Sequence, residues 1–530
     1  MAIAMNVLIG ALMVGLTSDL LFHDSIVHST PNGLSVLLWS ITVSLVVTVI
    51  TAAKKHGVER KCLWWLVPVN LSAFAYMWRD SAILHNIDVY LMFFSLVMLS
   101  FSLKGNVAQA SGIFDYALAS LTTGIDALME AMALIKVDLP WRQVVPHQVR
   151  GKVPALLRGF AFAVPLLLLF CGLFISADAA FASLLNKGLN FNFSDISVHT
   201  AILLGFTWCT AGYLRPMFVA DRANSNAFMK FGEQSESSEQ QSGIPNGTEG
   251  EIETAIPKVM LGFGRFELNV VLALLNLLFL SFVMVQFRYF FGGSNVVETT
   301  AGLSYAEYAR KGFFELATVS ALVLPMLLVG DWLLPRHRDK FDKIFPVQSG
   351  IQIALLFVIM LSAFQRMNLY QQEYGLTELR FYVSAFIGCM ALLYVIFAAT
   401  VLTGKRSKFA FAASIAALAS VAALQFANPD RIIVAANIDN AVKGKAFDAD
   451  YALSLSNDAT AYLAQNIGKL PFPAQKQIAG VLVSQEHHAW HYDVRSFNIA
   501  RCEAYYAIRN NLPLLNAINT IGAVPDPAAH

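Results

Sequence analysis

Apolar residues gather in eleven runs, each bounded by charged or turn-forming residues. A helix needs about 20 such residues to cross a bilayer. The pattern therefore predicts an all-α, polytopic membrane helix bundle. The first run lacks a basic n-region and a small-residue cleavage site, so it reads as a span, not a signal peptide. The predicted spans cover residues 3–22, 33–53, 62–78, 86–103, 158–178, 201–220, 267–287, 317–334, 349–365, 381–402 and 410–427.

The segment 110–136 has a different pattern. Its apolar residues recur at alternating spacings of four and three, which describes one face of an amphipathic helix: Phe114, Leu118, Leu121, Ile125, Leu128, Met132 and Ile135. The opposite face carries Asp115, Asp126 and Glu130. A helix on a membrane surface normally carries basic residues there, so the acidic face favours packing on protein. The apolar face would cover the chain's own loops, a second copy or a separate partner.

Beyond the last span, residues 428–530 read as a small helical domain. Asp448 and Ser456 are plausible helix N-caps, and Pro471 interrupts the helical pattern. Residues 221–260 form a polar linker that is too poor in apolar residues to fold. The predicted organisation is 1–103 with four spans, 104–157 with the amphipathic helix, 158–220 with two spans, 221–260 as linker, 261–427 with five spans, and 428–530 as the tail.

Lys and Arg are distributed unevenly between alternate loops. One set of loops holds twenty-one of these cations and the other set holds seven. The positive-inside rule places the richer set in the cytoplasm. The N-terminus is then cytoplasmic, and the odd number of spans places the tail outside.

Composition agrees with a membrane protein. Hydrophobic residues make up 56% of the 530 residues, charged residues 14%, and the mean hydropathy is +0.55 with a formal charge of +1. Soluble proteins carry about 25% charged residues. A soluble enzyme, a nucleic-acid binder and a disordered scaffold are therefore excluded, and membrane lipid is the expected surrounding.

Polar residues in or near the spans are few. Charged groups within a bilayer are costly, so they are candidates for function. The alternative is structural: charges at span ends snorkel to the interface, and Asn can join two helices by a hydrogen bond. The intramembrane candidates are Asp178, Arg215, Glu267, Asn276 and Asp331. No carboxylate lies in the middle of a predicted span, which counts against an ion-coupled transporter.

The densest polar chemistry lies in two predicted outer segments, 302–315 and 365–380. They hold four cations and four carboxylates, together with several tyrosines. Such a balanced set suits an ion-pair network that docks loops, and it also suits recognition of an anionic headgroup or a glycan. If the segments converge, the candidate ligand-binding cluster comprises Tyr305, Glu307, Tyr308, Arg310, Arg366, Tyr374 and Arg380.

Signatures of enzymes and metal sites are weak. His487 and His491 stand four residues apart, but a solvated helix face explains them as well as a metal pair. The five cysteines show no CxxC or Cys/His spacing. The sequence also lacks a Walker A loop, a dinucleotide-binding glycine motif and a nucleophile elbow. We expect no metal, no cofactor and no catalytic residues.

Several stretches resemble a bacterial family of multi-pass membrane proteins, the group of domains of unknown function numbered 4153/4173. The resembling stretches are SADAAF (176–181), GYLR (212–215), GLSYAEYARKGFFEL (302–316), SAFQRMNLYQQEYGLTELR (362–380) and DVRSFNIAR (493–501). The resemblance implies a bacterial cytoplasmic membrane location and an outer helical tail. It carries no activity and no catalytic residue.

Two classes of function remain open from the sequence. The first is binding or signalling at the outer face, in association with envelope components. The second is a transporter or flippase for a lipid or small solute. The missing midplane carboxylate favours the first class, and a membrane-embedded transferase would need an activating base that the sequence does not offer. Neither the ligand nor the oligomeric state follows from the sequence.

Overall fold

The computed structural model describes eight stretches of the chain: residues 2–28, 31–54, 60–139, 193–219, 265–291, 313–333, 344–488 and 493–520. These stretches contain helices and connecting turns but no β-strand, so the predicted all-α class is confirmed. Contacts divide the chain into two units, and a short piece of the tail, His491–Cys502, belongs to the first unit. Each unit is described separately below.

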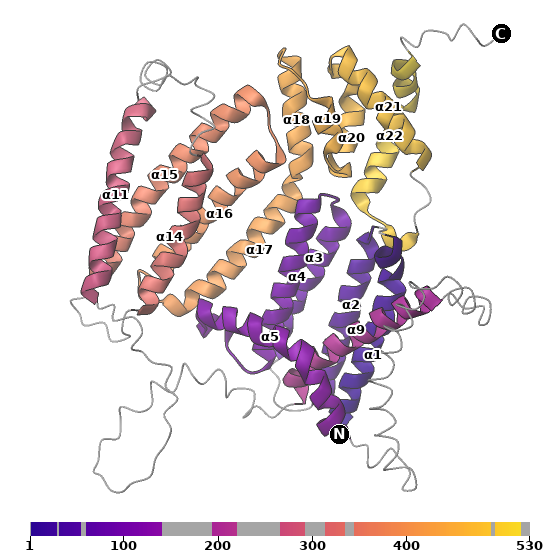
Figure 1. Cartoon of the computed structure of the whole chain (residues 1–530), viewed down its shortest axis with the longest axis vertical. Coiled ribbons are helices and arrows are strands. Elements are labelled where there is room, and N and C mark those ends of the chain that lie inside the picture. The colour runs from indigo at the N-terminus through magenta and orange to yellow at the C-terminus, as the bar shows by residue number, and fades with distance from the viewer. Residues whose placement is uncertain are drawn as a thin grey trace, which may run out of the picture. The chain divides into compact units, whose positions relative to one another are not determined.

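The first unit is built mainly from the N-terminal helices (Figure 1). α1 packs along α9, α2 contacts both α1 and α3, and α3 packs on α4. α5 runs obliquely to α3 and α4 and is continued by a π turn over Leu134–Asp138. The helices are α1 (Ala2–His28), α2 (Gly33–Ala53), α3 (Leu66–Trp78), α4 (Ala82–Leu103), α5 (Ile113–Ala133) and α9 (Phe193–Phe218).

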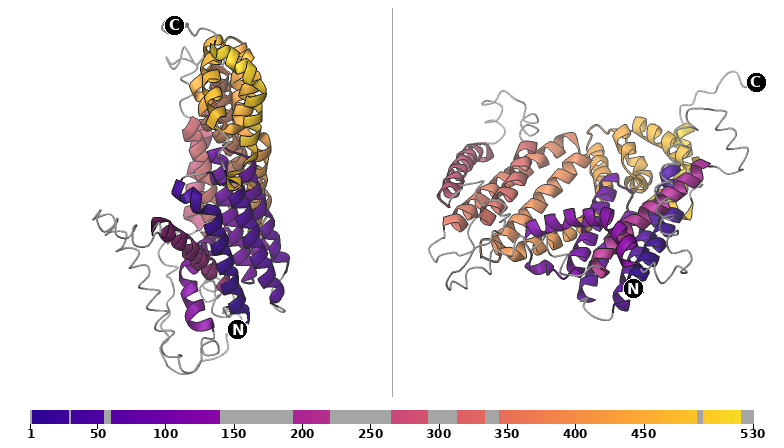
Figure 2. Two further views of the ribbon diagram at one scale, coloured as in Figure 1. Left: turned by 90° about the vertical axis from the view of Figure 1, so that its right-hand side faces the viewer. Right: turned by 60° about the horizontal axis from the view of Figure 1, so that its bottom comes forward.

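The second unit contains longer apolar helices followed by shorter ones. The longer helices are α11 (Arg265–Phe291), α14 (Phe313–Leu333), α15 (Ile344–Tyr374), α16 (Glu378–Thr400) and α17 (Phe409–Ala427). The shorter group is α18 (Pro429–Val442), α19 (Ala449–Ser454), α20 (Asn457–Asn466), α21 (Phe472–His488) and α22 (Ile499–Thr520), the last of which belongs to this unit from Glu503 onward. Figure 2 shows the shorter helices gathered at one end of α15–α17.

Ten of the eleven predicted spans coincide with helices, and the remaining one, 158–178, lies outside the described residues. Within the described stretches, seven helices are long and apolar enough to cross a membrane. They include α5 and its π turn, but α3 has only 13 residues. α11 and α14 have shorter apolar stretches, Leu268–Met284 and Leu316–Trp332. A membrane helix bundle is therefore supported, while the number of spans stays a prediction.

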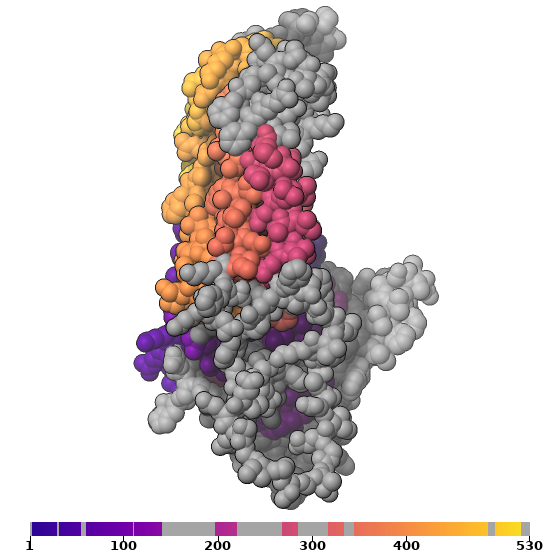
Figure 3. Space-filling view, turned by 90° about the vertical axis from the view of Figure 1, so that its left-hand side faces the viewer, coloured from indigo at the N-terminus to yellow at the C-terminus, as the bar shows by residue number. Residues whose placement is uncertain are grey.

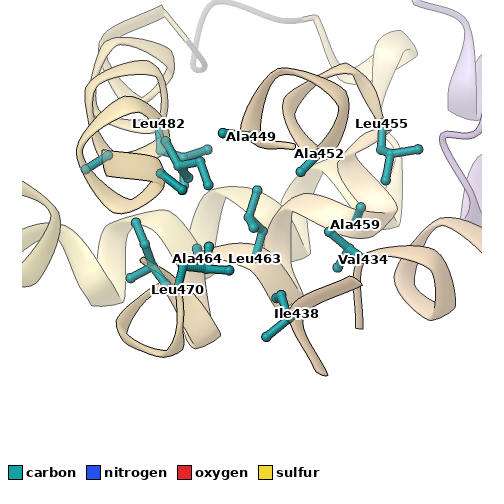
Figure 4. Packing of buried hydrophobic residues seen from close by; sticks show 14 of the residues in the cluster. Val434, Ile438, Ala449, Ala452, Leu455, Ala459, Leu463, Ala464, Leu470 and Leu482 are labelled. Carbon is teal, nitrogen blue, oxygen red and sulfur yellow. The ribbon is translucent and has the colours of Figure 1, made fainter. Parts of the chain in front are cut away.

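The tail has its own apolar core. Figure 4 shows side chains from α18–α21 gathered in one core, with Val434 beside Ala459, Ile438 below Leu463, and Leu482 on the side of Ala449. Local capping defines where the helices begin, because the first amides of a helix need acceptors. Asp448 accepts from the amide of Tyr451, and Ser456 accepts from that of Asp458. Both predicted N-caps are confirmed.

Candidate functional site

The predicted ligand-binding cluster is described in part. Tyr305, Glu307, Tyr308 and Arg310 lie outside the described residues, so the predicted convergence of the two segments stays a prediction. Arg366, Tyr374 and Arg380 lie on α15 and α16, on either side of the turn that joins these helices. Their surroundings show what the described half of the cluster does.

Arg380 completes the C-terminal end of α15. Its Nη1 donates to the backbone carbonyls of Tyr374 at 3.1 Å and Gly375 at 2.6 Å. Its guanidinium carbon lies 4.2 Å from the centroid of the Tyr370 ring. A cation at a helix C-terminus satisfies carbonyls that lack intrahelical donors and complements the helix dipole. These contacts favour the loop-docking interpretation for Arg380 over recognition of an anionic headgroup.

The same turn is clamped to α18 and α19. The Asn437 carboxamide pairs with the backbone of Leu376 through two hydrogen bonds of 2.8 Å. Gly375 has φ +76°, and an added Cβ would lie 2.8 Å from Asn437 Oδ1, so a side chain here would be strained and crowded. The Tyr451 hydroxyl accepts from the amide of Glu378, the first residue of α16, at 2.7 Å, and burial raises the pKa of Tyr451.

A second polar site lies in the first unit, where the segment Asp493–Arg501 seats on the ends of α1–α4. We call this segment the strap. Arg495 pairs with both Asp24 and Asp493, and it donates to the carbonyl of Leu20 at 2.6 Å. Arg501 Nη2 lies 2.5 Å from Asp80 Oδ1. The two arginines of the strap thus form ion pairs with Asp24, near the end of α1, and with Asp80, just after α3.

Asn498 is the most enclosed polar residue of the strap, with only 2% of its surface exposed. Its Nδ2 donates to the carbonyls of Tyr76 at 3.3 Å and Arg79 at 2.6 Å, at the C-terminal end of α3. Its Oδ1 accepts from the amide of Arg501, which caps α22. The Asn498 carboxamide therefore donates to carbonyls at the end of α3 and caps the start of α22, which links the two helices.

The approach of the strap to α2 is equally close. A Cβ at Gly33 would lie 2.0 Å from the carbonyl oxygen of Phe497, so only glycine allows this contact. Ser35 donates to the carbonyl of Arg495 at 3.2 Å. The Arg495 guanidinium lowers the pKa of the Asp493 carboxyl through a direct hydrogen bond.

Two stacked histidines lie beside the strap. The rings of His23 on α1 and His199 on α9 are parallel, with centroids 3.6 Å apart. His199 Nδ1 lies 2.8 Å from Asp19 Oδ1, and His23 Nδ1 lies 3.2 Å from Asp24 Oδ1. Since Asp24 also binds Arg495, these groups form one polar chain that reaches the strap. The described residues contain no group of three or more His, Cys, Asp or Glu side chains arranged to hold a metal.

The intramembrane candidates have different surroundings. Arg215 on α9 pairs with Glu130 of α5 and with Asp138, whose Oδ2 lies 2.5 Å from Nε. Asp331 is buried and lies 3.8 Å from Arg406. Both charged groups therefore have partners of opposite charge within the chain. Asn276 donates to the backbone of α15. Asp178 lies outside the described residues, and Glu267 belongs to α11 although its side chain is not described.

The amphipathic helix α5 turns two of its three acidic residues, Asp126 and Glu130, inward, whereas Asp115 is exposed. Asp126 binds Lys104 at 2.6 Å, and Glu130 binds Arg215. The apolar side chains point outward, and Leu121 and Leu128 are more than 60% exposed. The sequence identified this face, but it did not show that the acidic residues have partners within the same unit.

From the sequence, the strap was identified only as a stretch that resembles the family, and no role was predicted for its residues. A signal was present, since two arginines and an asparagine stand within seven residues, and Asp24 and Asp80 lie in the predicted loops 23–32 and 79–85.

A family model described as a domain of unknown function, DUF4153, matches residues 66–466. Neither the comparison with curated proteins nor that with solved structures finds a match.

Proposed function

Since the chain belongs to the DUF4153 family, which brings no activity with it, we propose from the geometry that this membrane protein binds an envelope component at its outer face and signals through the strap. The strap is the observation that supports this proposal. Its ion pairs and the Asn498 hydrogen bonds hold nine residues of the tail on the ends of four helices. A ligand that binds more tightly to one position of the strap shifts the population toward the helix arrangement that goes with that position.

The tail is suited to receive the ligand. It has its own apolar core, and Asn437 and Tyr451 anchor it to the turn between α15 and α16. The strap is joined by the chain to α21 on one side and forms the start of α22 on the other. A contact made by the tail therefore has a covalent route to the strap. Coupling of this kind requires two sites and a segment with two arrangements, and the strap is our candidate for that segment.

The proposed orientation places the tail outside the bacterial cytoplasmic membrane. The cation count of the loops supports it. The strap adds support, because it lies at the end of α1–α4 that carries the two cation-poor loops, those before α2 and α4. A tail that starts after an odd number of spans reaches that same side.

Sidedness and binding are testable together. In a chain without its native cysteines, Val494→Cys should react with a membrane-impermeant maleimide in intact spheroplasts but not in sealed inverted vesicles. Hydrogen exchange of the strap is then measured with fractions of periplasmic extract and with solubilised peptidoglycan fragments. A fraction that changes strap protection in the wild type, but not in Arg501→Gln, supports the proposal. Labelling only in inverted vesicles, or no change with any fraction, contradicts it.

A transporter or flippase is the second candidate. The observation that favours it is a buried polar atom near the middle of an apolar helix, Asn276 Oδ1, which has no hydrogen-bond partner among the described residues. Reconstituted protein that moves a fluorescent lipid or a labelled solute across liposomes would support this candidate. If substitutions in α11 or α15 reduce that flux and Arg501→Gln does not, the flux is separate from signalling through the strap.

A further inference from the structure

A polar group lies at one end of the contact between α1 and α9. Figure 3 shows α11 lying directly against the segment that holds α14 and α15, and apolar side chains such as Leu272 and Leu356 pack there. Where α1 packs on α9, two imidazole rings meet instead. The rings of His23 and His199 are parallel, with their centroids 3.6 Å apart. Both residues lie just outside the predicted spans, at the end of these helices where the strap is seated.

Carboxylates on α1 orient both rings. His199 Nδ1 lies 2.8 Å from Asp19 Oδ1, and His23 Nδ1 lies 3.2 Å from Asp24 Oδ1. An ionised carboxylate only accepts hydrogen bonds, so these contacts assign the proton of each neutral ring to Nδ1. A second proton must then bind at Nε2. His23 Nε2 is buried and has no hydrogen-bond partner among the described residues, so a proton there creates an N–H donor without an acceptor.

Asp24 connects His23 to the strap. Its Oδ1 faces His23, and its Oδ2 binds Arg495. The second carboxylate bound by Arg495 is Asp493, which belongs to the strap itself. Arg495 is tied to α1 by the Asp24 ion pair and by a hydrogen bond to the carbonyl of Leu20. When His23 is protonated, two cations share Asp24 and repel each other, so the hold of α1 on Arg495 weakens.

The charged and titratable groups around His23 set the direction of the response. Those on α1, on α9 and on the strap are Asp19, Asp24, His28, His199, Asp493 and Arg495. The neighbouring helix α2 carries no charged residue. At neutral pH three carboxylates face one arginine, and this excess of negative charge favours uptake of a first proton. A second proton is disfavoured, because two imidazolium rings 3.6 Å apart repel. Within this set, the histidines are the groups whose charge ordinarily changes between about pH 5 and 8.

We propose that His23 and His199 form a proton-sensitive latch, in which protonation of His23 at mildly acidic pH releases the strap from α1. The buried Nε2 and the shared carboxylate act together, because both disfavour the protonated ring in the packing seen here. His199 competes with His23 for the first proton, so the latch opens at a lower pH than His23 alone would require. In the proposed orientation this end of the helices faces outside, where the pH follows the surroundings. The inference rests on the strap as the moving segment of the proposed function, but it needs no envelope ligand.

The test measures strap opening between about pH 7.5 and 5, where histidines titrate. The full chain, without its native cysteines and with Ser496→Cys, is placed in nanodiscs and treated with 2,2′-dithiodipyridine, which reacts with thiols in mild acid. The rate is divided by that of Val494→Cys, an exposed position of the strap, to remove the reagent's own pH dependence. We expect the relative rate to rise by about two- to fivefold as the pH falls, the range for loss of one partly exposed ion pair.

Three variants separate the latch from other effects of pH. His23→Gln cannot be protonated, so it should abolish the rise whatever its rate at neutral pH. His199→Phe keeps a ring in the stack but removes the competing charge, so the rise should occur at higher pH. His28→Gln, at an exposed histidine of the same helix, is the matched control and should respond as the wild type does.

The outcomes are distinct from those of the ligand test. A flat wild-type rate over this range would overturn the proposal, as would a rise that persists in His23→Gln or disappears in His28→Gln. An unchanged response in His199→Phe would overturn the role of His199. The ligand test is carried out at one pH, so the proposed function can fail alone: strap opening that follows the protonation of His23, while no fraction changes strap protection, would support the latch and contradict signalling by an envelope component.

Discussion

Replacing Asn498 tests whether the strap is held as the structure shows. Asn498→Ala removes the cap of α22, which contributes about 1 kcal/mol in typical helices. It also removes the Asn498 amide as a donor to the carbonyls of Tyr76 and Arg79, which His85 Nε2 still approaches at 3.0 and 2.7 Å, so this loss contributes about 0.5–1.5 kcal/mol. The strap should therefore open more easily by about 1.5–2.5 kcal/mol. Since about 1.4 kcal/mol is a factor of ten, the open fraction should grow by roughly ten- to sixty-fold.

Asn498→Asp separates the two contributions. Aspartate caps a helix as well as asparagine does, but its carboxylate cannot donate to the two carbonyls. This variant should therefore keep the cap and lose the tie to α3. The free energy of strap opening should fall by about 0.5–1.5 kcal/mol, the part assigned to the hydrogen bonds with the carbonyls. Asn516→Ala, at an exposed position of α22, is the matched control and should leave the strap closed.

The assay is cysteine protection at Ser496, a residue of the strap with only 5% of its surface exposed. Ser496→Cys is introduced into a chain without its five native cysteines, and the rate of maleimide labelling reports the open fraction. Equal rates for the Asn498 protein, Asn498→Ala and Asn498→Asp would refute the reasoning. A fast rate in Ala with a wild-type rate in Asp would show that only the cap matters.

The other predictions concern single contacts. Gly375→Ala should lower the free energy of unfolding by about 1–2 kcal/mol, measured as a lower Tm, because φ is +76° and the new Cβ would lie 2.8 Å from Asn437 Oδ1. Gly388→Ala is the control and should leave Tm unchanged, because no atom lies within 4 Å of its new Cβ. Arg215→Gln should destabilise the first unit, measured by Tm, because Glu130 and Asp138 lose their shared cation; the double replacement Glu130→Gln with Asp138→Asn should restore part of the loss. Asp493 has a lowered pKa in the folded chain, so its contribution to strap closure is present above its ordinary pKa and is lost as pH falls through the lowered value. The Asp493-dependent part of strap opening, followed at Ser496→Cys with 2,2′-dithiodipyridine because maleimides need the thiolate and this reagent reacts in acid, should increase only in acid below the histidine range, and Asp493→Asn should remove that acid-dependent component.

Local patterns predicted the helices well. The N-caps Asp448 and Ser456 act on amides two or three residues away, so the information lies within one turn of sequence. The apolar runs gave most predicted spans for the same reason. The short α3 shows the limit, because the run beginning at 62 starts as a 3-10 turn over Arg60–Trp65 before the α-helix forms.

Long-range partners could not be predicted in this way. Arg501 pairs with Asp80 and Arg495 with Asp24, and more than 420 residues separate each pair. From charge alone, each of these arginines could pair with any of 36 acidic residues. The choice depends on the ends of α1 and α3 lying together, which follows from packing of the first unit and from no local pattern. Asn276 was singled out from the sequence, but its partner, the backbone carbonyl of Gln348, lies 72 residues away and could not be predicted.

The amphipathic helix α5 shows that a pattern gives two faces but not their directions. Its acidic face was taken to oppose contact with lipid, yet Asp126 and Glu130 are neutralised by Lys104 and Arg215 within the unit. Those two cations were counted among the cytoplasmic twenty-one, and the buried Arg79 among the opposing seven; removing all three still leaves nineteen against six. The orientation argument thus survives. An acidic face paired internally no longer opposes a lipid surface, so the exposed Leu121 and Leu128 are compatible with one.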